Sequence, residues 1–180
     1  MRIIAGLAKG RRLRGPEGEG TRPMMDRVRE ALFSSLEPLI EDAEVLDLFA
    51  GSGSIGLEAL SRGAARVVFV ERGRKALAAL RDNVSAVGLG GEIVPGDVSR
   101  HLEGSFDRFD LVFVDPPYDL PLASVEEVLG NVKARLRTGG VVVVHRRADT
   151  GIPEVPGLEM VDRRRYGDTE ITRFATEEDR

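Results

Sequence analysis

The stretch DLFAGSGSIG, residues 47–56, decides the fold of this 180-residue chain. It joins an apolar run, EVLDLFA at 44–50, to a run of helical periodicity, SIGLEALSRG at 54–63. The first run predicts a buried strand and the second a helix. A G-x-G-x-x-G pattern therefore lies between a strand and a helix, where the turn lets a ligand approach the backbone and the helix N-terminus. Its glycines are Gly51, Gly53 and Gly56.

Apolar runs alternate with helical patterns through most of the chain. Strands are predicted at 44–50, 65–71, 91–97, 109–115 and 139–146, and helices at 26–41, 54–63, 73–88 and 122–137. Asp26 is the expected N-cap of the first helix, which Pro38 is expected to kink or shorten. Two alternating runs at 158–175, about Gly167 and Asp168, predict a closing hairpin. The predicted class is α/β, doubly wound and Rossmann-like: a mostly parallel seven-stranded sheet, an antiparallel C-terminal hairpin and a short basic N-terminal extension.

The N-terminus differs in charge from the rest of the chain. Residues 1–15 hold five basic residues and no acid, and residues 1–30 hold eight basic and four acidic residues, a local net charge of +4. Since the whole chain has a net charge of −4, the remaining 150 residues have a net charge of −8. A basic segment on an acidic body favours a polyanionic partner. We therefore predict a basic arm or hairpin at 1–25 and the main domain at 26–180.

Composition excludes several classes of protein. There is no cysteine, so disulfides, thiolate metal sites and thiol nucleophiles are excluded, and we expect no metal. The N-terminal stretch MRIIAGLAKGRRLRG has no apolar core of a signal peptide. Long apolar runs such as VVVV at 141–144 are of strand length, far below the roughly 18 residues of a membrane span. We expect a cytoplasmic protein without a membrane partner.

Acidic side chains stand where successive strands are predicted to end. Asp47 precedes the glycines, Glu71 ends the second strand, and Asp97 ends the third. In open α/β sheets, ligands bind at these strand ends. Either a dinucleotide or S-adenosylmethionine fits the glycine loop and a ribose-binding acid at Glu71. Asp47 favours S-adenosylmethionine, because a carboxylate suits an ammonium group and opposes a pyrophosphate; Asp97 could accept the adenine amine. Each acid could instead be a helix cap.

The stretch VFVDPPYD, residues 112–119, ends a buried strand with a carboxylate, two prolines and an aromatic ring. The prolines stiffen the turn and hold Asp115 in extended geometry. Asp115 and the Pro116 carbonyl could accept both hydrogens of an exocyclic amine and direct its lone pair at a methyl group. Pro117 would keep the turn rigid, and Tyr118 would stack on the base.

The glycine loop at 47–56 and the DPPY stretch at 115–118 resemble motifs of the class I S-adenosylmethionine-dependent methyltransferases. DPPY is similar to the D/N-P-P-Y motif of the members that methylate amino groups. The chain resembles the RsmD family over almost its whole length. The resemblance rests on five stretches in this order: MRIIAG, TRPMMDRVREALF, VLDLFAGSGSIGLEALSRGA, FDLVFVDPPY and YGDT. The resemblance implies methylation of the N2 amine of a guanine in 16S rRNA, at position 966. The implied partners are 16S rRNA and the 30S subunit or its assembly intermediate, and the expected state is a monomer.

The resemblance also implies roles for individual residues. The donor, S-adenosylmethionine, would be bound by Asp47, Ala50, Gly51, Gly53, Glu71 and Asp97. The catalytic residues would be Asp115, Pro116, Pro117 and Tyr118. The RNA would be contacted by Arg2, Lys9, Arg11, Arg12, Arg14, Arg22 and Arg27.

Two positions depart from the family pattern. Met24 and Met25 stand where the family has hydroxyl residues, and His145 stands where it usually has glutamate; we assign His145 no role. Three alternatives remain: an NAD-linked oxidoreductase, an amino-methyltransferase acting on another RNA or DNA base, and a ribosome-assembly protein without catalysis. The first leaves residues 115–118 unexplained, and the intact Asp115–Tyr118 stretch argues against the last.

Overall fold

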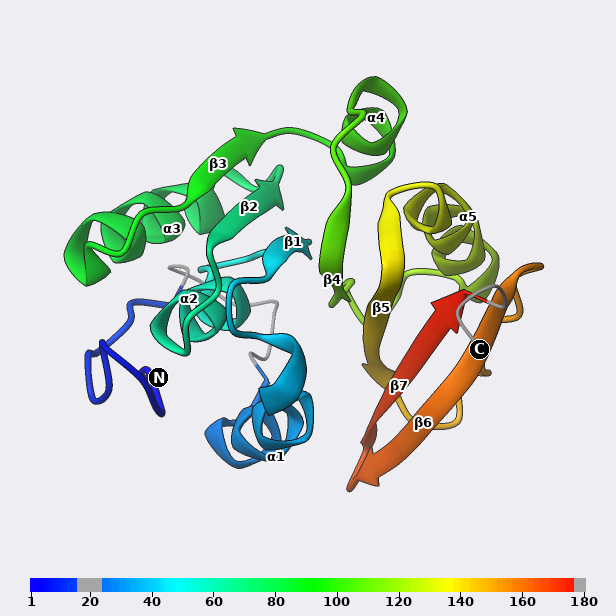
Figure 1. Cartoon of the computed structure of the whole chain (residues 1–180), viewed down its shortest axis with the longest axis horizontal. Coiled ribbons are helices and arrows are strands. Elements are labelled where there is room, and N and C mark those ends of the chain that lie inside the picture. The colour runs from blue at the N-terminus through cyan, green and yellow to red at the C-terminus, as the bar shows by residue number, and fades with distance from the viewer. Residues whose placement is uncertain (16–23, 177–180) are drawn as a thin grey trace.

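The computed structural model describes residues 1–15 and 24–176. Within these residues, a seven-stranded sheet runs in the order β3-β2-β1-β4-β5-β7-β6 (Figure 1). Strands β1 to β5 pair in parallel, and β7 and β6 are antiparallel. The strands are β1 (Glu44–Leu48), β2 (Arg66–Glu71), β3 (Glu92–Pro95), β4 (Phe109–Val114), β5 (Leu136–Arg147), β6 (Leu158–Tyr166) and β7 (Thr169–Thr176). The predicted parallel sheet with a closing hairpin is confirmed.

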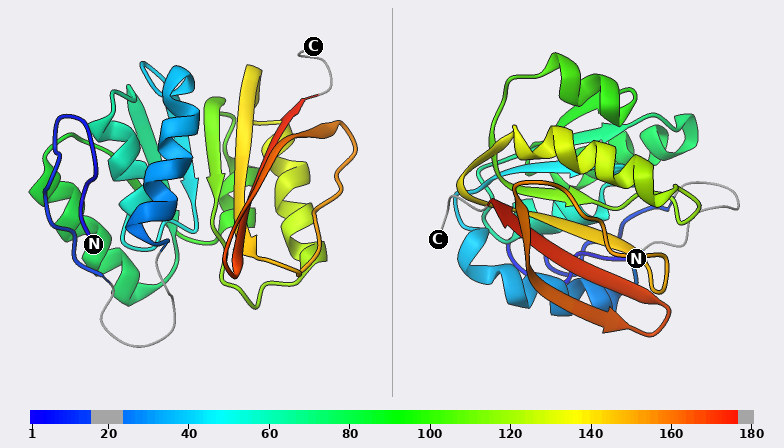
Figure 2. Two further views of the ribbon diagram at one scale, coloured as in Figure 1. Left: turned by 90° about the horizontal axis from the view of Figure 1, so that it is seen from below. Right: turned by 90° about the vertical axis from the view of Figure 1, so that its right-hand side faces the viewer.

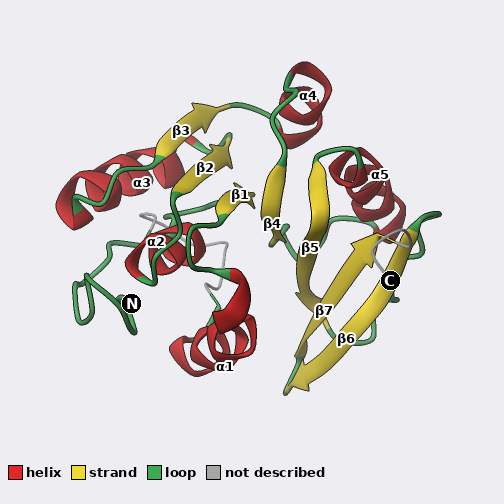
Figure 3. Ribbon diagram, viewed as in Figure 1, coloured by secondary structure: helices red, strands yellow, loops and turns green. Residues whose placement is uncertain are grey.

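Helices cover both faces of this sheet, as Figure 2 and Figure 3 show. They are α1 (Asp26–Leu36), the 3-10 turn η1 (Glu37–Leu39), α2 (Ser54–Ser61), α3 (Arg74–Val87), α4 (Val98–Gly104) and α5 (Leu122–Lys133). Helices α1, α2 and α3 form one apolar core with strand residues such as Val45, Val67 and Leu111. The alternate residues, such as Leu46 and Val68, form a second core with α4 and α5. Both faces of the central strands are buried, which explains their continuous Val and Leu runs.

The first helix begins and ends differently from the prediction. Its N-cap is Met25, which makes no side-chain cap, so the assignment of Asp26 as N-cap is wrong. Asp26 lies instead in the first turn, where its carboxylate accepts a hydrogen bond from Arg29 at 3.1 Å. The α-helix ends at Leu36 and continues as the 3-10 turn η1, which contains Pro38. The predicted shortening of the helix at Pro38 is confirmed, because proline has no N–H for the helical ladder.

Residues 1–15 are attached to the main domain rather than extended from it. The backbones of Ile3 and Arg11 pair at 2.9 Å in an irregular hairpin, and the Ile3 side chain is fully buried in the α1–α3 core. Gly6 makes the contact with α2, because a Cβ there would lie 1.7 Å from the Ser61 carbonyl oxygen. The irregular hairpin forms part of the arm predicted at 1–25, and residues 16–23 of that arm, with Arg22, lie outside the described residues.

In residues 1–15 and 24–176, no helix is both long and apolar enough to cross a bilayer.

Candidate active site

The carboxyl ends of the parallel strands bring the predicted acids to one edge of the sheet. The chain passes from β1 outward to β2 and β3, and then returns to the other side of β1 to form β4 and β5. The strand order therefore reverses between the neighbouring strands β1 and β4, and α/β sheets bind ligands at the carboxyl ends of the strands at such a switch point. Leu48 of β1 pairs with Val114 of β4, so the glycine loop and Asp115 leave the sheet side by side.

Glycine is required at the three positions of the loop for different physical reasons. Gly51 and Gly53 have φ values of 57° and 84°, in the left-handed region that favours glycine. A Cβ on Gly53 would lie 2.4 Å from the Leu80 side chain, and one on Gly56 would lie 2.3 Å from the Phe69 ring, so both serve close packing. A Cβ on Gly51 would meet no described atom within 4 Å. The open side of Gly51 is therefore where a ligand can approach the loop.

Asp47 is a fully buried carboxylate at the end of β1. Its Oδ2 accepts a hydrogen bond from the Gly56 amide at 2.9 Å, whereas its Oδ1 has no partner among the described residues. Burial raises the pKa of Asp47 to about 8, against the Gly56 hydrogen bond, and the charges of Asp115 and Glu71 raise it further. A buried carboxylate with a free oxygen is best satisfied by a cationic donor group.

Glu71 holds the glycine loop from the end of β2. Its two oxygens accept hydrogen bonds from the amides of Gly51 at 2.8 Å and Gly73 at 2.6 Å. The Ala50 amide donates to the Val70 carbonyl at 3.0 Å, and this hydrogen bond fixes the backbone of the loop to β2. Each Glu71 oxygen has further acceptor capacity, which suits a pair of hydroxyl groups.

Asp97 is the N-cap of α4. Its Oδ1 accepts hydrogen bonds from the amides of Ser99 at 3.0 Å and Arg100 at 3.3 Å, and its Oδ2 lies 3.5 Å from an Arg72 guanidinium nitrogen. The side chain is half exposed, so its second oxygen is open to a ligand. The capping role is thus present, and the contact with an adenine amine stays a prediction.

The DPPY residues directly follow β4, and a tight turn begins at Pro117. Asp115 has a side chain that is 25% exposed, and Pro116 is buried beneath it. The Pro117 carbonyl accepts a hydrogen bond from the Leu120 amide at 3.0 Å. Tyr118 is an exposed aromatic residue on the same turn. The arrangement places an acceptor and an aromatic face next to the glycine loop.

His145, at the end of β5, is the site residue that the sequence analysis missed. Its Nδ1 lies 2.8 Å from Asp115 Oδ1, and its ring lies edge-on to Tyr118 with centroids 6.1 Å apart. The side chain is only 4% exposed. The one signal in the sequence was that histidine departs from the family pattern at this strand end. The pairing with Asp115 spans 30 residues, and only the parallel register of β4 and β5 brings the two together.

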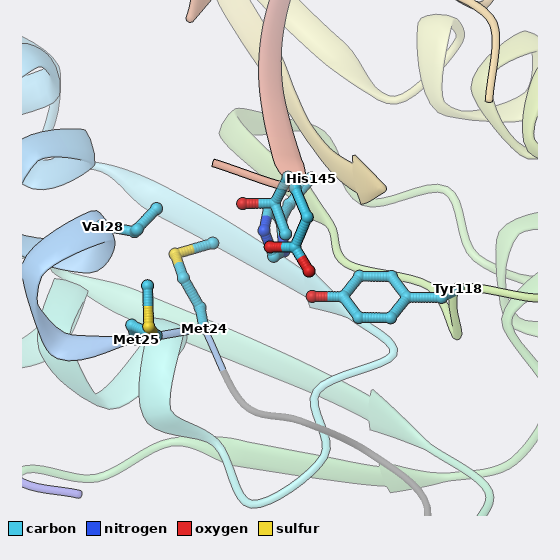
Figure 4. A pocket seen from close by; sticks show the side chains of 7 residues that line it. Met24, Met25, Val28, Tyr118 and His145 are labelled. Atoms are coloured by element: carbon cyan, nitrogen blue, oxygen red, sulfur yellow. The ribbon is translucent and has the colours of Figure 1, made fainter. Parts of the chain in front are cut away.

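A small pocket opens beside these residues (Figure 4). Its volume is about 40 Å³. Tyr118 and His145 line it from one side, and Met24, Met25 and Val28 at the start of α1 line it from another (Figure 4). Asp168 and Thr169, in the turn between β6 and β7, complete the lining. The two methionines that depart from the family pattern are therefore walls of this pocket.

The predicted RNA-contacting residues divide into two groups, apart from Arg22. Arg2, Lys9 and Arg27 line a groove of about 350 Å³, together with the acids Asp26 and Glu30. Arg11 donates to the Ala86 carbonyl at 2.7 Å and Arg14 pairs with Asp82 at 3.2 Å, so both lie along α3. Arg12 is bridged through its backbone to Arg2. The groove brings three of the predicted cations together.

These residues fit S-adenosylmethionine better than a dinucleotide. The free oxygen of Asp47 suits an ammonium group, and the open side of Gly51 leaves room for the ligand. The charges of Asp115 and Glu71 act on the buried Asp47 at this edge, and they would repel a pyrophosphate there. In the described segments, no three His, Asp or Glu side chains are grouped as metal ligands.

Comparisons with known proteins identify the family of this chain. A family model described as "Conserved hypothetical protein 95" matches residues 1–175. The chain is 38% identical to "Ribosomal RNA small subunit methyltransferase D" of Escherichia coli (strain K12) over 159 residues, which are 87% of this chain and 79% of the relative.

Solved structures have the same architecture. "Putative methyltransferase yhhF from Escherichia coli" superposes with a TM-score of 0.87 at 35% identity, over 98% of each chain. "SMU.776, a putative methyltransferase complexed with SAH" superposes with a TM-score of 0.68 over 81% of this chain and 48% of that one. Its identity is 13%, so it shows the fold alone.

Proposed function

Because this chain belongs to the RsmD family of S-adenosylmethionine-dependent methyltransferases, we propose that it methylates the N2 amine of a guanine in 16S rRNA. The observation that supports the chemistry is the position of Asp115 beside the glycine loop, at the switch point between β1 and β4. The name of the Escherichia coli relative supports an RNA of the small subunit. The proposed target is the guanine at position 966.

Four residues would hold the donor. Asp47 would pair with its ammonium group, and the open side of Gly51 would face its main body. Glu71, already fixed by two backbone amides, would accept hydrogen bonds from the ribose hydroxyls. The Asp97 Oδ2, which also lies 3.5 Å from Arg72, would accept the adenine amine. When bound, S-adenosylmethionine supplies an electrophilic methyl group on a sulfonium.

The chain's own residues would orient the amine. The lone pair of an exocyclic base amine is delocalised into the ring, which makes it a weak nucleophile. Asp115 and the Pro116 carbonyl would each accept one N–H, and this draws the nitrogen towards tetrahedral geometry with its lone pair directed at the methyl group. The nitrogen forms the new N–C bond as the S–C bond breaks, and one amine proton leaves, with Asp115 placed to accept it. Tyr118 would stack on the base, a contact worth ~1–3 kcal/mol.

The RNA would be bound outside this site by the basic arm. Arg2, Lys9 and Arg27 surround one groove and would contact phosphates. Since the amine of a base in a structured RNA must be made accessible, we propose that the target base leaves its stack when the enzyme binds. We propose that the enzyme acts as a monomer in the cytoplasm, on the 30S subunit or its assembly intermediate.

Substitution of Asp115 tests the role of the DPPY turn. Asp115→Ala should reduce methyl transfer by about two or more orders of magnitude, because an oriented acceptor acting in a transition state has effects of this size. Donor affinity, measured by calorimetry, should stay within a few-fold. The matched control is Asp119→Ala, an exposed carboxylate four residues later that should leave turnover unchanged. Equal turnover in the two variants would refute the role of Asp115.

A further inference from the structure

One nitrogen of His145 is buried without a hydrogen-bond partner. Nδ1 contacts Asp115 at 2.8 Å, whereas Nε2 has no partner among the described residues although the side chain is only 4% exposed. Buried polar atoms of native proteins are nearly always paired. Since His145 also lines the small pocket beside Tyr118, a ligand group in that pocket could supply the missing partner.

The contact with Asp115 determines what kind of partner Nε2 requires. A carboxylate can only accept a hydrogen bond, so the proton of a neutral imidazole must lie on Nδ1. The other nitrogen then has a free lone pair, and it can only accept. His145 therefore places an acceptor next to the carboxylate that is proposed to bind the target amine.

An acceptor beside an amine-binding carboxylate distinguishes between nucleobases. The N2 amine of guanine is adjacent to N1–H, a donor. The exocyclic amines of adenine and cytosine are adjacent to a bare ring nitrogen, an acceptor. We propose that His145 is a specificity-determining residue whose Nε2 accepts the guanine N1–H while Asp115 and the Pro116 carbonyl accept the N2 hydrogens. This inference rests on the proposed function, and it names what selects the base.

The pocket walls suit a planar ring that enters between them. Tyr118 lies near His145 with its hydroxyl end toward the pocket, and Met24 and Met25 lie on the opposite side (Figure 4). The present volume of about 40 Å³ holds only a few waters, so the base must displace side chains. Methionine is the apolar residue that adapts most readily to such a change, and Met25 is already 53% exposed.

Asp168 is the one carboxylate among the described residues that line the pocket. Asp168 is exposed, so water can satisfy its carboxylate oxygens when the pocket is empty. His145 differs because it is buried and is bonded to the proposed catalytic carboxylate. The contrast between these two residues supplies a matched control.

The test uses a base analogue that keeps the amine and removes the N1 hydrogen. Small subunits are reconstituted with 16S rRNA that carries either guanosine or 2-aminopurine riboside at the methylated position. 2-Aminopurine presents the same N2 amine next to a bare N1. We expect the native enzyme to prefer guanosine by ~10–100-fold in kcat/KM, the effect of one mismatched buried hydrogen bond.

Variants of His145 should change that preference. His145→Phe should reduce the guanosine-to-aminopurine ratio at least tenfold, whereas His145→Gln should retain most of it, because its amide N–H can donate to Asp115 and its oxygen can accept. The ratio is informative because misplacement of Asp115 would slow both substrates alike, as in a double-mutant cycle. Donor binding by calorimetry verifies that each variant is folded, and Asp168→Asn should leave the ratio unchanged.

Two results would overturn the proposal. One is an unchanged ratio in His145→Phe, and the other is a native enzyme that methylates guanosine and 2-aminopurine equally well. Either result, obtained with methylation still at N2, would refute the role of His145 and leave the proposed function standing. If the native enzyme methylates no guanine N2, both proposals fail together.

Discussion

Asp47 combines complete burial with a carboxylate oxygen that has no partner among the described residues. Burial raises its pKa to about 8 from the ordinary 3.8. Between these pH values, the folded protein holds a proton that the unfolded chain has released. Raising the pH through this window therefore destabilises the free protein. A cationic ligand beside Asp47 would favour the charged form and release the proton.

This linkage predicts proton release on donor binding. At pH 7 the native protein should release about one proton per S-adenosylmethionine bound, because a group with this pKa is then mostly protonated. Calorimetry in two buffers of different ionisation enthalpy measures this number. Asp47→Asn should release none and should bind the donor more weakly. Proton release that is equal in the two proteins would show that Asp47 is not the group that meets the ammonium.

Contacts between elements determine the shape of the N-terminal arm. Glu58 of α2 is fully buried, and its oxygens accept hydrogen bonds from the amides of Ile4 at 2.8 Å and Ala5 at 3.0 Å. It also lies 4.0 Å from the buried guanidinium of Arg29 on α1, which donates to the Arg2 carbonyl. Burial lowers the pKa of Arg29, and Asp26 and Glu58 oppose this effect. One carboxylate thus connects α1, α2 and the arm.

Removal of this carboxylate should be strongly destabilising. Glu58→Ala removes the buried carboxylate that pairs with Arg62 at 2.8 Å, leaves Arg29 with Asp26 as its acidic partner, and leaves two backbone amides unpaired. A broken buried pair costs about 3–5 kcal/mol. Glu127→Ala, an exposed position on α5, is the matched control and should change the free energy of unfolding by less than about 0.5 kcal/mol. Chemical denaturation of both variants measures the difference. A loss below about 1 kcal/mol in Glu58→Ala would mean that solvent reaches the Arg29 site.

The elements could be predicted where local pattern decides them. The buried strands are continuous Val and Leu runs, and the glycine loop is recognised by its local pattern of glycines between a strand and a helix. The pairing of Glu58 with the arm and of His145 with Asp115 could not be predicted, because the partners lie 54 and 30 residues apart. Asp26 resembled an N-cap in the sequence, but its carboxylate turns to Arg29. Tertiary contacts of this kind leave no periodic signal in the sequence.

At the scale of the whole molecule, positive charge is concentrated at one end of an acidic chain. Residues 1–30 have a net charge of +4 and the remainder has −8. Many other arginines are already paired with acids: on β6, Arg163 pairs with Glu170, Arg164 with Asp162, and Arg165 with Asp149. Arg2, Lys9 and Arg27 line a groove that also holds Asp26 and Glu30, so its cations outnumber its acids by one, and we take these three cations as the candidates for phosphate contacts.

Neutralising this groove should change the salt dependence of RNA binding. The triple variant Arg2→Ala, Lys9→Ala, Arg27→Ala should bind rRNA more weakly, with a slope of log affinity against log salt reduced by up to about 3. The control replaces Arg163, Arg164 and Arg165 with alanine and should leave the slope unchanged. Fluorescence titrations at several salt concentrations provide both slopes. Identical slopes in the native protein and the groove variant would mean that the arm makes no phosphate contacts.

The central claim, methylation of a guanine N2 amine, is tested most directly by identifying the product. Small subunits that lack the modification are incubated with the enzyme and donor labelled in its methyl group, and the rRNA is digested to nucleosides. The account predicts that the label is recovered as N2-methylguanosine from position 966 of 16S rRNA. Label on another base or another atom, or no transfer by an enzyme that binds the donor, would contradict it.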